Sequence, residues 1–345
     1  MPGKKRIEYI DLAKGICILL VVSMHVAPDI GGGYGFLTCL RMPLYYCLSG
    51  MFFKQYGGFN SFLIKKTDKL LLPFLAWYLI GYLVYYIRVF AIGEPEHIFR
   101  ITDLFTEPEF YNGSLWFLLS LFWCNLLFYP ITKISDKAGV QAVIVFLLAS
   151  IGWIWSYADL HNFLYIGTTL TCLPFFFIGR ELMGRDILKG DKNLRKDIGV
   201  FIGCMIIAMA CLLLPEEPVF MRFYLNHIDS GDPLTLYICS VSLVVMTLIL
   251  CKYVVRLPYV SYLGRYSIIV LVTHVLIYNI INRGVRHLTG MPLEDATFDL
   301  ILLLTIIASM AIVIPVCRKY LPYITAQKNL LEDRIRVRGE LKAQS

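Results

Sequence analysis

A lysine and a histidine stand eleven positions apart in the first apolar stretch of the chain. In a helix, Lys14 and His25 lie on one face, three turns and about 20° apart, with about 16 Å between them along the axis. An ammonium group can hold a phosphate as a point charge, and a neutral imidazole can accept a proton from a hydroxyl group. One wall of a cavity could therefore present a cation at one end and an imidazole at the other. The alternative is that His25 is a packed, hydrogen-bonded histidine.

Two arginines also fall inside apolar stretches, Arg41 in the second and Arg88 in the third. Like Lys14, each costs about 2.5 to 3.5 kcal/mol at the centre of a membrane helix, so it should face protein, ligand or a water-filled cavity. Arg41 is expected at a depth close to that of His25, where the two could share a pocket. The alternative for both arginines is that they snorkel to the outer headgroups.

Three further residues belong to the candidate site. Ser114 and Trp116, at the outer start of the fourth stretch, reach a level similar to that of Arg41, although a tryptophan there is also the ordinary interfacial anchor. His274 is expected nearer the middle of the membrane, where a buried imidazole needs a partner but need not be catalytic.

The composition places these residues in a membrane protein. Of 345 residues, 58% are hydrophobic and 17% are charged, and the mean hydropathy is +0.66, outside the range of soluble domains. The pattern predicts an all-α polytopic protein with about ten transmembrane helices, because the apolar runs are long enough to cross the bilayer. The ten expected helices cover residues 8–28, 36–53, 70–92, 114–130, 140–157, 162–180, 198–214, 233–253, 263–283 and 297–317.

The basic residues lie mainly in short loops on one side of the predicted helices. That side, which includes both termini, carries 25 Lys and Arg, whereas the opposite side carries four. The positive-inside rule therefore places both termini in the cytoplasm. The net charge of +7 therefore follows the membrane topology and does not indicate a nucleic-acid partner.

One membrane domain over residues 1–320 and a basic cytoplasmic tail over 321–345 is the simplest organisation. The tail mixes apolar with basic residues, so it either lies along the membrane surface or forms a solvated helix. The ten cysteines are scattered, without a CxxC pair or a Cys/His metal spacing, so we expect packing roles for them and no metal.

Four segments of the chain resemble the acyltransferase-3 family of membrane acyltransferases, especially its fucose-4-O-acetylase-like and exopolysaccharide-modifying branch. The first segment ends at His25 and contains the family's basic residue, ten spacers and histidine, with Lys14 where Arg is more frequent. The segments, in chain order, are RIEYIDLAKGICILLVVSMH at 6–25, RMPLYYCLSGMFF at 41–53, SLWFLLSLFW at 114–123 and YLGRYSIIVLVTH at 262–274.

The resemblance implies an O-acyltransferase in the bacterial plasma membrane. Such an enzyme moves an acyl group, with acetyl expected, from cytoplasmic acyl-CoA to a hydroxyl of a cell-surface or lipid-linked carbohydrate. With no fused extracytoplasmic catalytic domain in the sequence, we expect transfer to occur within the membrane domain.

The resemblance also suggests roles for the candidate residues. We expect His25 to be the general base, Arg41 to stabilise the oxyanion, and Lys14 to hold a phosphate of the coenzyme. Substrate-binding roles are assigned to the remaining candidates, Arg88, Ser114, Trp116 and His274. Asp29 is a candidate for orienting His25, and Asp11 is expected to pair with a basic residue near the cytoplasmic end.

Two other functions are compatible with buried charges in a helical membrane protein. One is a transporter or exporter of a glycan or another small molecule, which predicts inverted repeats that the sequence does not show. The other is a non-catalytic subunit of a surface-polysaccharide assembly. The acceptor sugar, the acyl group, the side of the membrane on which transfer occurs and the oligomeric state are left open by the sequence.

Overall fold

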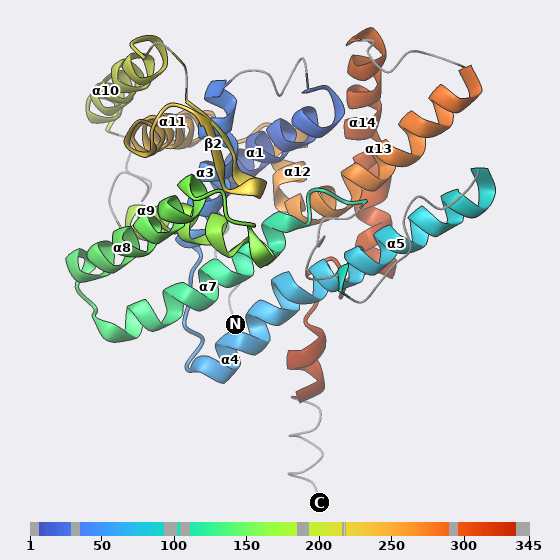
Figure 1. Cartoon of the computed structure of the whole chain (residues 1–345), viewed down its shortest axis with the longest axis horizontal. Coiled ribbons are helices and arrows are strands. Elements are labelled where there is room, and N and C mark those ends of the chain that lie inside the picture. The colour runs from blue at the N-terminus through green and yellow to red at the C-terminus, as the bar shows by residue number, and fades with distance from the viewer. Residues whose placement is uncertain are drawn as a thin grey trace, which may run out of the picture. The chain divides into compact units, whose positions relative to one another are not determined.

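Long apolar helices make up most of the chain in the computed structural model. The model describes residues 7–28, 35–92, 102–103, 111–184, 193–215, 217, 219–289 and 296–335. The α-helices of this part of the chain (Figure 1) are α1 (Glu8–Val26), α3 (Gly35–Met51), α4 (Phe59–Lys66), α5 (Leu72–Ile92), α7 (Trp116–Ile134), α8 (Ala138–Tyr157), α9 (Ile166–Gly184), α10 (Leu194–Leu213), α11 (Pro233–Val254), α12 (Pro258–Arg265), α13 (Ser267–Thr289) and α14 (Ala296–Tyr320).

Eight helices in the described residues are long and apolar enough to cross a membrane, and a ninth span results if α12 and α13, which meet at 90°, are counted together. The chain is thus an all-α polytopic membrane protein, as predicted, but the predicted number of about ten crossings is not confirmed. The second expected span is present as α3, whose 17 residues fall short of the roughly 20 that a straight crossing needs.

The chain divides into two compact units, and each is built from separated segments. The first unit contains residues 1–53, 134–162 and 167–267, and the second contains 54–133, 163–166 and 268–345.

In the first unit, α1 packs closely against α12 through a glycine on each helix. A Cβ at Gly15 would lie 2.0 Å from the carbonyl oxygen of Val260, and a Cβ at Gly264 would lie 1.9 Å from that of Asp11. Only glycine permits backbones to approach so closely. The approach also brings Asp11 within 3.8 Å of Arg265, which confirms that Asp11 pairs with a basic residue.

Helices α3 and α9 of this unit also pack closely through a glycine on each helix. A Cβ at Gly50 would lie 1.9 Å from the carbonyl oxygen of Phe176, and a Cβ at Gly179 would lie equally close to that of Cys47. The two helices that carry the sequence-predicted residues of the first unit, α1 and α3, are therefore each held by a crossing that a methyl group would disrupt.

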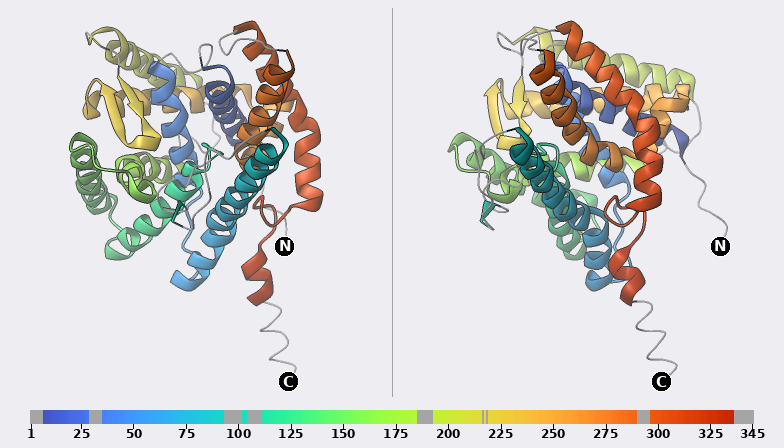
Figure 2. Two further views of the ribbon diagram at one scale, coloured as in Figure 1. Left: turned by 45° about the vertical axis from the view of Figure 1, so that its right-hand side comes forward. Right: turned by 90° about the vertical axis from the view of Figure 1, so that its right-hand side faces the viewer.

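A short hairpin interrupts the helices between α10 and α11. Strands β1 (Phe220–Arg222) and β2 (His227–Ser230) pair antiparallel around a 3-10 turn (Phe223–Leu225) and are drawn in yellow in Figure 2. The turn ends at Asn226 in a left-handed conformation with φ of 54°. The sequence predicted a plain outside loop here, and a three-residue strand is too short to show a clear alternation of apolar residues.

A buried ion pair connects α10 to α11 in the first unit. Lys252 Nζ lies 2.9 Å from Asp197 Oδ2, the side chains are 3% and 4% exposed, and the hydroxyl of Tyr253 donates to the same oxygen over 2.8 Å. The expected helices left Asp197 in a loop and placed Lys252 at a helix end, whereas the structure places both inside helix ends, paired with each other.

In the second unit, α4 and α5 are joined by a π-helical turn (Thr67–Leu71) into one long helix, visible as a continuous rod in Figure 1. Its start at Phe59 corrects the predicted start at residue 70. The lysines at 65, 66 and 69 made the sequence pattern read as a loop, but all three are half-buried positions of one continuous helix.

Residues 321–335, the described C-terminal segment of the second unit, are hydrogen-bonded to this long helix. Trp77 Nε1 donates to the carbonyl of Ile324 over 2.9 Å, and Lys69 Nζ donates to that of Ala326. The carboxylate of Asp68 accepts the backbone N–H groups of Leu331 and Glu332 at 2.9 and 3.1 Å. Asp68 therefore caps the short helix that begins at residue 330.

Candidate active site

The first helix presents Lys14 and His25 on one uninterrupted α-helix. Because α1 runs without a break from Glu8 to Val26, the helical relation predicted for the two residues holds along its length. Both side chains are half-buried, and His25 lies in the last turn of the helix. The ammonium group of Lys14 lies over the ring of Phe52, 4.5 Å from its centre, a cation–π contact that offsets part of its desolvation.

The third candidate of this unit, Arg41, is 3% exposed on α3. Its main-chain carbonyl accepts a hydrogen bond from the thiol of Cys17 on α1 over 3.0 Å. Cys17 is one turn beyond Lys14, so this contact ties the helix of Arg41 to the segment of α1 between the lysine and the histidine. The first unit thus brings the helices of Lys14, His25 and Arg41 together.

The other four candidates belong to the second unit. Ser114 is buried, and its hydroxyl lies 2.7 Å from the carbonyl oxygen of Leu271 on α13 and 3.0 Å from the side-chain oxygen of Asn112, two acceptors for its single proton. Asn112 in turn donates to the carbonyl of Val272 over 3.0 Å. These two side chains bind the stretch of α13 that leads to His274, so Ser114 positions that helix in addition to its predicted substrate role.

His274 is fully buried, and its Nδ1 lies 2.8 Å from the carbonyl oxygen of Val270. A carbonyl oxygen only accepts, so Nδ1 carries a proton, and when the ring is neutral Nε2 is its basic nitrogen. The tautomer of the neutral ring follows from this contact with Val270, which the sequence alone could not predict.

Trp116 and Arg88 both lie against aromatic rings of the second unit. Trp116 is 7% exposed, and its ring centre is 5.9 Å from that of Tyr165. The guanidinium of Arg88 lies 5.6 Å from the ring centre of Tyr85 and is half-buried, a position compatible with either of its predicted environments. Asp29, the candidate for orienting His25, lies outside the described residues.

No group of three His, Cys, Asp or Glu residues that could hold a metal ion occurs in the described part of the chain. The first unit has the cation of Lys14 and the imidazole of His25 on α1. The buried guanidinium of Arg41 is on α3, which is hydrogen-bonded to α1. Such groups serve proton transfer and stabilisation of a developing anion.

Sequence reasoning missed the residues that position this site. Gly15, Gly50, Gly179 and Gly264 are indistinguishable in a single sequence from Gly199 and Gly203, which have open space beside them. Asn112 is not among the residues that the sequence singled out, yet its side chain is fully buried and bonded to α13.

The fold and these residues define a polytopic membrane protein with a basic residue and a histidine on its first helix. A family model described as an acyltransferase domain matches residues 7–317, nearly the whole chain, and the chain belongs to this family, acyltransferase-3. The comparisons with curated proteins and with solved structures gave no match. The chain is therefore a membrane acyltransferase.

Proposed function

We propose that the chain is an O-acyltransferase that moves an acyl group, acetyl above all, from cytoplasmic acyl-CoA to a hydroxyl of a cell-surface or lipid-linked carbohydrate. The observation that carries this proposal is that Lys14 and His25 lie on one continuous helix. A hydrogen bond from the Cys17 thiol links this helix to the helix of buried Arg41. The family match makes acyl transfer the reaction class.

In the proposed reaction each residue acts on a different part of the substrates. Acyl-CoA supplies a thioester whose carbonyl carbon is open to attack. His25 accepts the proton of the acceptor hydroxyl as the new ester C–O bond forms, and it returns that proton to the departing thiolate as the C–S bond breaks. The Arg41 guanidinium donates hydrogen bonds to the carbonyl oxygen while it carries negative charge.

Lys14 is the proposed contact for a coenzyme phosphate. Its separation from His25 along the axis, about 16 Å, is comparable to the length of an extended acyl-pantetheine arm. A single donor molecule could then reach from the lysine to the histidine. Arg88, Ser114, Trp116 and His274 are proposed to contribute to the binding of substrate.

The proposal includes a place in the cell. With both termini in the cytoplasm, as the distribution of Lys and Arg predicts, Lys14 lies towards the cytoplasmic pool of acyl-CoA and His25 towards the outer leaflet. The bacterial plasma membrane and the exopolysaccharide-modifying branch of the family follow from the resemblance of the four sequence segments.

Mass spectrometry of cell-surface glycans from strains with and without the gene tests the proposal. A mass difference of one acyl group, restored by the wild-type gene, is the expected result. The purified protein in vesicles should also transfer label from acetyl-CoA to the glycan. Glycan movement across vesicles in the absence of acyl-CoA, without transfer of label, would favour a transporter instead.

A further inference from the structure

The hairpin β1–β2 is fixed in the first unit by a network of buried polar groups. Asn226 accepts a hydrogen bond from Thr171 over 2.8 Å through Oδ1, and donates to the carbonyl of Gly152 over 2.9 Å through Nδ2. Asn162 donates to the carbonyl of Tyr224 over 2.9 Å. The amide of Asn226 is buried with its donor and acceptor satisfied, and that of Asn162 is half-buried, so together they hold the hairpin in one conformation.

The hairpin also packs against the helix of Arg41. The residue before β1, Val219, is fully buried, and its carbonyl accepts from the thiol of Cys39 on α3 at 3.9 Å. Cys39 is two residues from Arg41 in the same helix. The hairpin is therefore a neighbour of α3 at the level of that arginine.

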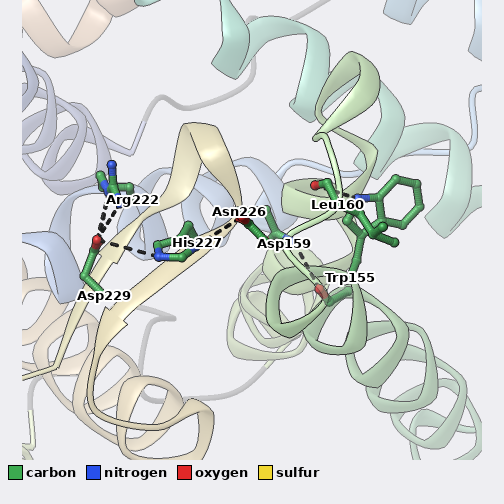
Figure 3. Close-up of polar contacts among 8 residues, drawn as sticks. Trp155, Asp159, Leu160, Arg222, Asn226, His227 and Asp229 are labelled. Atoms are coloured by element: carbon green, nitrogen blue, oxygen red, sulfur yellow. Dashed lines mark hydrogen bonds and ion pairs between the residues drawn. The ribbon is translucent and has the colours of Figure 1, made fainter.

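Four planar polar side chains form a row on the exposed face of the hairpin and the adjoining loop (Figure 3). The guanidinium of Arg222 binds both oxygens of Asp229, with the shortest contact 2.6 Å. His227 follows, with Nε2 3.9 Å from Asp229 Oδ1 and Nδ1 3.6 Å from Asp159 Oδ1. The side chains are 41%, 27%, 37% and 91% exposed in the order Arg222, Asp229, His227, Asp159.

The charges and donors of this row select one class of ligand. Two carboxylates and one guanidinium give a net charge of minus one with a neutral imidazole and zero with a protonated one, so the row does not favour a phosphate. The described residues also contain no cluster suited to a metal ion. What the row presents is an alternation of donors and acceptors. Neighbouring sugar hydroxyls, each both donor and acceptor, match that alternation.

We propose that the row Arg222–Asp229–His227–Asp159 binds the hydroxyl groups of an uncharged carbohydrate acceptor. This inference rests on the proposed function and adds to it the residues that select the acceptor. Under the predicted topology the hairpin is extracytoplasmic, on the side where a surface glycan is available. The net charge of the row favours a neutral sugar as the acceptor over a phosphorylated one.

The test compares variants of the row with a matched carboxylate outside it. Asp159 has a positive φ of 47°, so Asp159→Gly removes the carboxylate without straining the backbone. His227→Gln removes the imidazole and retains a polar side chain. Glu217→Gln is the control, because Glu217 is exposed in the connection between α10 and β1, shortly before the hairpin, and belongs to no contact of the row.

The substrate used is the set of neutral oligosaccharides released from the surface polysaccharide of cells that lack the gene. Each row variant should raise the KM for these oligosaccharides about tenfold, the loss expected for one hydrogen bond to a charged group. The KM for acetyl-CoA and the melting temperature should stay at the wild-type values, as should all parameters of Glu217→Gln. If the row had only a structural role, its variants would instead have a lower melting temperature or changed KM values for both substrates.

Direct binding separates this inference from the proposed function. Saturation-transfer NMR with the same oligosaccharides should show contact with the wild-type protein and the control, and a loss of signal in both row variants. If the wild-type protein binds the oligosaccharides but transfers no acyl group, the proposed function fails and the row stands. If the row variants bind and react like wild type, the row is a solvated ion-pair network only and the inference is overturned.

Discussion

Gly15 on α1 and Gly264 on α12 each pack against the backbone of the opposite helix at the position that a Cβ atom would occupy. A Cβ at Gly264 would lie 2.4 Å from the backbone nitrogen of Gly15 itself. Backbone atoms cannot rotate away as a side chain can, so any larger residue at either position must separate the helices. Lys14 is the neighbour of Gly15, and the crossing therefore also determines where the candidate coenzyme contact lies.

Gly15→Ala and Gly264→Ala should each destabilise the protein by roughly 1 to 3 kcal/mol or more, the usual range for overpacking. Gly199→Ala and Gly203→Ala on α10 are the matched controls, because nothing lies within 4 Å of a Cβ at either position. These should be neutral or stabilising by up to about 1 kcal/mol. Melting temperatures in detergent measure the difference. Equal melting temperatures for Gly264→Ala and Gly203→Ala would contradict the close crossing.

Asp197→Ala should destabilise the protein strongly, by about 3 to 5 kcal/mol, because it leaves the buried ammonium of Lys252 without its carboxylate. The double variant Asp197→Leu with Lys252→Met removes both charges and should recover most of the loss. Denaturation in detergent compares these two variants with the wild-type protein, and the single variants Asp197→Leu and Lys252→Met complete a double-mutant cycle. A double variant no more stable than Asp197→Ala would show that the pair is needed for more than its charge balance.

Asp68→Ala should release the C-terminal segment from the long helix α4–α5. The variant loses the acceptor of two backbone N–H groups, Leu331 and Glu332, and caps of this kind stabilise a helix by about 1 kcal/mol. Limited proteolysis should then cut the segment after residue 327 faster than in wild type, with the rest of the chain unchanged. Asp136→Ala, at an exposed position outside this contact, serves as the control.

Docking of the same segment should weaken in acid. The hydrogen bond from Lys65 lowers the pKa of Glu332 below its ordinary value. A lowered pKa in the folded protein means that the carboxylate contributes fully above the unfolded pKa of about 4.3 and loses its contribution as the pH falls through the folded pKa. The contribution is less than about 1 kcal/mol, because the side chain is half exposed.

Hydrogen exchange of residues 328–335, corrected for intrinsic rates, should therefore be constant from about pH 5 to 8 and rise below about pH 4. Glu332→Gln should exchange faster at neutral pH and lose part of the acid response. An increase between pH 6 and 8 would point to another group.

His25→Ala should lower acyl transfer by about 10² to 10⁴-fold, the usual contribution of a general base, while the protein still reaches the membrane. Lys14→Ala should mainly raise the KM for acyl-CoA. Labelled acetyl-CoA and purified glycan provide the assay, and membrane fractionation provides the control for insertion. Transfer by His25→Ala at the wild-type rate would remove its assignment as the base.

Most of the membrane helices could be predicted from the sequence, because a run of about 20 apolar residues has few other stable structures. The prediction was poorer where charge and apolar residues mix. The stretch from Phe59 to Lys69 was assigned to a loop for its lysines. The 90° bend before α13 falls inside the single helix predicted for 263–283, because hydropathy gives no information on the direction of a helix.

The candidate site could be predicted only in part. Charges in apolar runs identify Lys14, His25 and Arg41, because their cost in lipid requires a partner. The contacts that hold them depend on which helices meet, and neither the thiol of Cys17 nor the glycines have a distinctive local pattern. The hairpin row joins Asp159 to residues more than sixty positions away, a proximity set by α8, α9 and α11 together.

The partnership of the first helix with α12 also governs the order of events during synthesis. Residues 8–26 enter the membrane first, but the surface that receives Gly15 consists of residues 258–265 and does not yet exist. At about 5 to 20 residues per second, translation delivers it roughly ten to fifty seconds later. Until then Asp11 lacks the arginine with which it pairs and Gly15 lacks the backbone against which it packs, so a chain cut short before α12 leaves the first helix without this crossing.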